Sequence, residues 1–66
     1  MISDPDIYRA AKLVMEQQGE QAAMFAAGRA EQLLEDGDIH GALVWRGILV
    51  AIEEMQRGPL EGEAVN

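Results

Sequence analysis

The sequence lacks cysteine and threonine, and its aromatic residues are one tryptophan, one tyrosine and one phenylalanine. Without cysteine, disulfide bonds cannot stabilise the fold, and a zinc site would depend on carboxylates and the single histidine. The hydroxyl nucleophiles are confined to Ser3 and Tyr8. These absences fit a protein of a reducing compartment and argue against a covalent or metal-dependent enzyme.

Basic residues and long apolar runs are also few. Five Lys and Arg stand against twelve Asp and Glu, which gives a net charge of −7. Direct binding to nucleic acid or to anionic membranes requires clustered basic side chains, so neither is expected. The most apolar run, residues 42–52, is interrupted by Arg46 and is too short to span a bilayer. Residues 1–6 lack the basic and apolar regions of a signal peptide, and we therefore expect a cytoplasmic protein without a membrane partner.

Residues 36–48, Asp-Gly-Asp-Ile-His-Gly-Ala-Leu-Val-Trp-Arg-Gly-Ile, form the most informative segment. Gly37 can end one helix in a left-handed cap. Asp38 can begin the next helix by accepting hydrogen bonds from its first backbone N–H groups. Trp45 follows two turns later, so the segment predicts a helical hairpin with a large aromatic anchor.

Apolar residues recur at helical spacing in three segments of the chain. These segments are residues 5–18, 20–36 and 38–57. Pro5 suits the first position of a helix, Gly19 can end the first helix, and the very short turns make consecutive helices antiparallel. We predict an all-α domain over residues 1–57, an antiparallel three-helix bundle, followed by a flexible acidic tail at residues 58–66.

The middle segment carries a stripe of small and apolar residues that should face the core. They are Ala22, Ala23, Ala26, Ala27, Ala30, Leu33 and Leu34. Small residues allow neighbouring helices to approach closely, and Trp45 of the third segment would fill the space that they leave. Trp45 is therefore predicted to be the core anchor, and the alternative is that it lines a binding groove.

The candidates for chemistry are weak. His40, the only histidine, falls in the first turn of the third segment, where no closed pocket is expected. Asp36, Asp38 and His40 resemble the beginning of a calcium-binding loop, but the position that needs a bidentate glutamate is Gly47. We predict no catalytic residue, no metal site and no cofactor.

Two large apolar residues of the third segment fall on its polar side. At about 100° per residue, Leu43 and Val50 lie beside Arg46, with Gly47 between them, where a glycine would let another backbone approach. A chain of 66 residues buries only about 60% of its unfolded surface, so one copy has little stability in reserve. We therefore predict an interaction face at Leu43, Gly47 and Val50 that forms a homodimer or binds another protein.

Acidic residues should gather at one end of an up-down-up bundle. The set is Asp4, Asp6, Glu31, Glu35, Asp36 and Asp38. Such an acidic end could imitate a row of phosphates and occupy the basic groove of a nucleic-acid-binding protein. It could equally be solvated surface that favours helix starts.

The run Gly-Asp-x-x-Gly-x-x-x-Trp-x-x-Ile resembles a family of short, uncharacterised alphaproteobacterial helical proteins. The matching residues are Gly37, Asp38, Gly41, Trp45 and Ile48, preceded by Asp4-Pro5 and Gly19. The resemblance covers most of residues 4–56 and implies a compact helical domain. The family has no assigned activity, so no functional residue is carried over from it.

Together these patterns predict a small non-enzymatic protein that acts in protein–protein interaction or as an accessory protein, and that self-associates through its third helix. The alternative is an acidic decoy that inhibits a nucleic-acid-binding protein.

Overall fold

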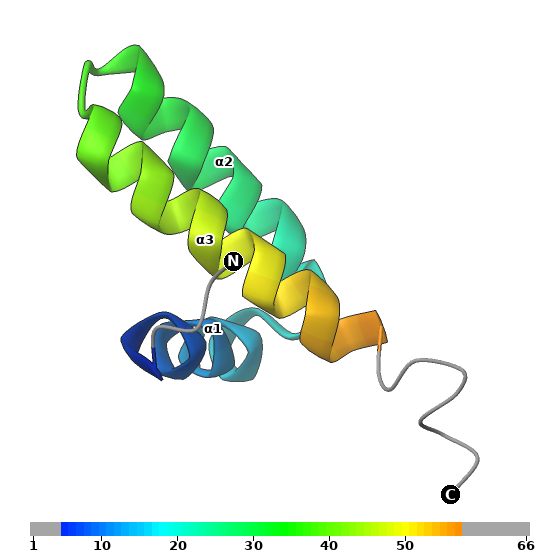
Figure 1. Ribbon diagram of the computed structural model, residues 1–66. Coiled ribbons are helices and arrows are strands. Elements are labelled where there is room, and N and C mark those ends of the chain that lie inside the picture. The colour runs from blue at the N-terminus through cyan, green and yellow to red at the C-terminus, as the bar shows by residue number, and fades with distance from the viewer. Residues whose placement is uncertain (1–4, 58–66) are drawn as a thin grey trace, which may run out of the picture.

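A computed structural model of the chain describes residues 5–57, which form three α-helices and one short 3₁₀ turn (Figure 1). The elements are α1 (Pro5–Gln18), η1 (Gly19–Gln21), α2 (Ala22–Glu35) and α3 (Ile39–Arg57). The all-α prediction is confirmed for this range. The tail predicted at residues 58–66, and Ser3 and Asp4, lie outside the described residues.

The helices begin and end within two residues of the expected ranges, and the largest difference is at the start of α2. This helix was expected from residue 20 but begins at Ala22, after the 3₁₀ turn. Gly19 has a φ of +60°, a left-handed conformation that glycine adopts at little cost. The backbone therefore leaves the α1 direction at Gly19 and uses η1 to turn before α2 begins.

The turn between α2 and α3 has the geometry that its residues predicted. Gly37 has a φ of +84°, and its N–H donates to the Leu34 carbonyl at 3.1 Å. The Asp38 N–H donates to the Leu33 carbonyl at 2.8 Å, and this pair of bonds is a Schellman cap. The Asp38 carboxylate then accepts a hydrogen bond from the Gly41 N–H at 2.9 Å, which caps the start of α3.

Gly41 has a steric role in the same cap. A Cβ atom at this position would lie 2.7 Å from the Asp38 Oδ2 atom. A larger residue would therefore push the capping carboxylate away from the first turn of α3. Gly37, Asp38 and Gly41 together end α2 and begin α3.

Figure 1 shows α2 and α3 side by side, while α1 crosses them near the end that lies away from the turn. The core contains residues from all three helices. They are Ala11 and Val14 of α1, Ala22 and Ala26 of α2, and Ile48, Ala51 and Ile52 of α3. The predicted bundle of three antiparallel helices is not confirmed, because α1 runs across the α2–α3 pair in Figure 1.

A hydrogen bond joins α1 to α3 at the edge of the core. The Tyr8 hydroxyl donates to the Glu54 Oε1 atom at 2.9 Å. This hydrogen bond, with smaller contributions from partial burial and from the negative charge of Glu54, raises the pKa of Tyr8 above its ordinary value of 10.0. The hydroxyl therefore reports whether α1 is docked.

Tyr8 is the only tyrosine, so an absorbance titration of the phenolate measures this contact directly. Its pKa should lie above 10.0 in the folded protein, and Glu54→Ala should bring it back toward that value. Because the folded-state pKa is the higher one, the contact stabilises the fold fully below the unfolded pKa, and this stability is lost as the pH rises through the folded pKa. The control is Glu53→Ala at the neighbouring exposed position. A pKa of Tyr8 that Glu54→Ala leaves unchanged would contradict the hydrogen bond between Tyr8 and Glu54.

Candidate functional site

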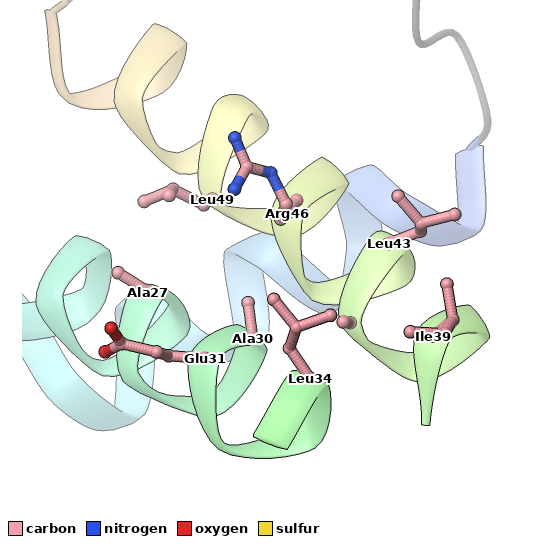
Figure 2. Close-up of a pocket in the computed structure, with 9 residues that line it drawn as sticks. Ala27, Ala30, Glu31, Leu34, Ile39, Leu43, Arg46 and Leu49 are labelled. Carbon is pink, nitrogen blue, oxygen red and sulfur yellow. The ribbon is translucent and has the colours of Figure 1, made fainter. Parts of the chain in front are cut away.

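A groove of about 580 Å³ lies between α2 and α3, next to the turn that joins them. Its lining is mostly apolar. The lining residues are Ala27, Ala30, Glu31 and Leu34 of α2, and Ile39, Ala42, Leu43, Arg46 and Leu49 of α3. Figure 2 shows their side chains on one face of the two helices, with α1 behind them. The groove is therefore on the face of the α2–α3 pair that α1 does not cover.

Three large side chains around this groove are exposed to an unusual degree. The exposed fractions are 55% for Leu34, 55% for Ile39 and 63% for Leu43. Between them the surface is formed by small residues, Ala30 and Ala42, both of which are buried. Single exposed apolar residues are ordinary, but a group drawn from two helices around one hollow is typical of a surface that another chain covers.

Two opposite charges flank the groove, Glu31 on α2 and Arg46 on α3. Their charged groups do not point toward one another (Figure 2), and within residues 5–57 the structure gives an ion pair only between Arg9 and Asp6. Glu31 and Arg46 are both exposed. The groove therefore has a negative and a positive wall, each available to a charge from outside.

The predicted interaction face is only partly supported. Leu43 lines the groove, and Val50 is exposed without lining it. Gly47 was expected on the surface between them, and this was wrong, because Gly47 is buried. It lies one turn before Ala51, a residue of the buried core, so the face of α3 that carries Gly47 is covered by the rest of the fold.

Leu34 and Ile39 are the residues that the sequence analysis missed. Leu34 was assigned to the buried stripe of α2, yet more than half of its side chain is exposed. Ile39 is the first residue of α3 and received no role. Both adjoin the turn, beyond the region that α1 covers. Two signals in the sequence could have found them: the proximity of both to the Gly37 cap, and the four-residue spacing of Ile39 and Leu43 on one helix face.

Trp45 packs against the edge of the core and is half-buried, so its predicted role as the core anchor is supported only in part. Its ring packs edge-on against Phe25, with centroids 5.9 Å apart, and the Arg29 guanidinium lies 5.7 Å from its centroid. The centre of the core is Ile52, the largest side chain with no exposed surface. Trp45 is not one of the groove residues, and its ring contacts Phe25 and Arg29.

The acidic residues that were predicted to gather at one end of the molecule lie in two separate places. Glu31, Glu35, Asp36 and Asp38 are exposed on the last turns of α2 and in the following turn. Asp6 belongs to α1, which lies away from that turn, and it pairs with Arg9. Its predicted place beside the other acids was therefore wrong, and Asp4 lies outside the described residues.

The described residues give little support for a site around the histidine, a metal site or a membrane-spanning helix. His40 is exposed in the first turn of α3. Over residues 5–57, no three His, Asp or Glu side chains come together in a way that could hold a metal ion. None of the helices in the same range has the length and apolar character needed to cross a membrane.

Comparisons with protein-family models, with curated proteins and with solved structures gave no match to this chain. The resemblance to the alphaproteobacterial helical family stays a prediction.

Proposed function

We propose that this protein is a small, non-enzymatic interaction or accessory protein, which binds a protein partner through the groove between α2 and α3. The observation that supports this most is the exposure of Leu34, Ile39 and Leu43 around a single hollow. Core residues shared by α1, α2 and α3 support a single three-helix unit as its scaffold. The absence of cysteine agrees with a cytoplasmic location.

The shape of the groove suits a helical partner. Two neighbouring helices with small residues between them leave a channel in which an amphipathic helix can place its apolar side chains. Covering the exposed parts of Leu34, Ile39 and Leu43 would contribute about 3 kcal/mol in all. This is modest against the cost of association, so the charges and the surface beside the groove must contribute as well.

The acidic decoy is the second candidate, and it has less support. Four acids lie on or next to the turn, but Glu31 is one of the groove residues and Asp38 is engaged in capping α3. With Asp6 on α1, away from the turn, the acidic end is smaller than expected. A short row of exposed acids ordinarily serves only to keep a protein surface soluble.

The test of the proposed function is photo-crosslinking from the groove. A photoreactive phenylalanine analogue at Leu43 should give discrete adducts, with the purified protein alone or with extract of its native host. The same analogue at Gln17, an exposed position on α1, is the matched control and should give none. A helix bound in the groove would lie within reach of position 43 and away from position 17.

The mass of the adduct identifies the kind of partner, since a second copy doubles the mass of the chain. Equal crosslinking from both positions, or no adduct from Leu43 under either condition, would overturn the proposal that the groove binds a protein.

A further inference from the structure

We infer that the occupant of the groove is a second copy of this chain, related to the first by a two-fold axis that runs along the α2–α3 pair. The inference rests on the proposed function and names the partner for the same groove. Its basis is the placement of Glu31 and Arg46 on opposite walls.

A groove with a negative wall and a positive wall is complementary to itself after a half turn. Glu31 projects from α2 and Arg46 from α3, and neither has an ion-pair partner within residues 5–57 (Figure 2). When two copies face each other about an axis parallel to the helices, α2 of each lies over α3 of the other. Glu31 of each copy then faces Arg46 of the other, which gives two equivalent cross pairs.

The alternative two-fold axis, perpendicular to the helices, places α2 over α2 and α3 over α3. The two Glu31 side chains would then lie on one side of the interface, and the two Arg46 side chains on the other side. The charges therefore select the first arrangement. It yields a four-helix core from two α2–α3 pairs, with α1 on each outer face.

The apolar surface agrees with this arrangement. Leu34, Ile39 and Leu43 surround the groove and would enter the centre of the four-helix core. The buried residues Ala30 and Ala42 would let the two pairs approach closely. This arrangement also brings the acidic turns of the two copies to the same end, where their repulsion opposes association and is weakened by salt. Association is therefore best measured near 0.15 M salt, where the screening length is about 8 Å.

The experiment is a charge reversal with a mixing step. Glu31→Arg and Arg46→Glu should each weaken the dimer at least 10-fold, because each change turns two attractive pairs into two repulsive ones. Mixed one to one, the two variants should associate about as tightly as the unmodified chain, since each contact then again joins Arg to Glu. Sedimentation equilibrium measures the four dissociation constants, those of the unmodified chain, of each variant and of their mixture, and circular dichroism confirms that the variants are folded.

Matched controls come from α1. Lys12→Glu and Glu16→Arg make the same kinds of charge change at exposed positions outside the groove, and neither should alter the dissociation constant. A mixture of the Glu31 and Arg46 variants that associates no better than either alone would overturn the inference. So would an unmodified chain that stays monomeric at hundreds of micromolar.

The oligomeric state and the crosslinking result together distinguish a failure of this inference from a failure of the proposed function. A monomer that crosslinks from Leu43 to a different protein overturns the second copy but leaves the groove as a binding site. A monomer with no crosslink from Leu43 overturns both.

Discussion

Replacing Ile52 with alanine should lower the free energy of unfolding by about 3–4 kcal/mol. Ile52 has no exposed surface and is the largest side chain of which this is true. It packs in the buried core cluster, where four of the six other residues are alanines, whose side chains are too short to reach into the space that the lost carbons leave. A chain of 66 residues has a total stability of about 3–10 kcal/mol, so this one change should remove at least about a third of it.

Urea and thermal denaturation followed by circular dichroism measure this loss. The matched control is Val50→Ala on the same helix, where 43% of the side chain is exposed and the expected cost is below about 1 kcal/mol. Losses of similar size at positions 50 and 52 would contradict the position of the core.

Replacing Trp45 with alanine should lower the stability by about 2–3 kcal/mol. The cost is below that of a fully buried tryptophan because Trp45 is half-buried. The substitution removes the edge-on contact with Phe25 and the contact with the Arg29 guanidinium. Alanine has the higher helix propensity, which offsets a few tenths of a kcal/mol of the loss.

Trp45→Phe is the control, because it keeps an aromatic ring for Phe25 and Arg29 and should lose about half as much. The same denaturation experiments apply. If Trp45→Ala left the unfolding midpoint unchanged, the ring would have no structural role, and its interpretation as part of a binding surface would return.

The turn between α2 and α3 could be predicted from the sequence because its causes are local. A positive φ at Gly37 and a capping carboxylate at Asp38 depend on residues within one turn of each other. The approximate helix ranges followed from the periodicity of apolar residues for the same reason. Local chemistry also explains the largest shift of a helix boundary, since Gly19 bends the chain before α2.

The errors have a non-local cause, the way in which the three helices cover one another. Periodicity shows which face of a helix is apolar, but it does not show how much of that face a neighbouring helix covers. Gly47, expected on the surface of α3, is buried, and Leu34, expected in the core-facing stripe of α2, remains exposed. Leu43 was predicted as an interaction residue from α3 alone, where Ile39 lies one turn before it, while Leu34 of α2 joins the two only through the turn.

The most direct measurement of the central claim, that the groove binds a second copy, is a series of ¹H–¹⁵N NMR spectra of the whole chain from about 10 µM to 1 mM at 0.15 M salt. The expected result is that concentration-dependent shifts occur at the groove residues, with Leu34, Ile39, Leu43 and Arg46 prominent, while Leu13 and Gln17 on α1 stay constant. Spectra that do not change with concentration, or changes that concentrate on α1, would contradict the claim.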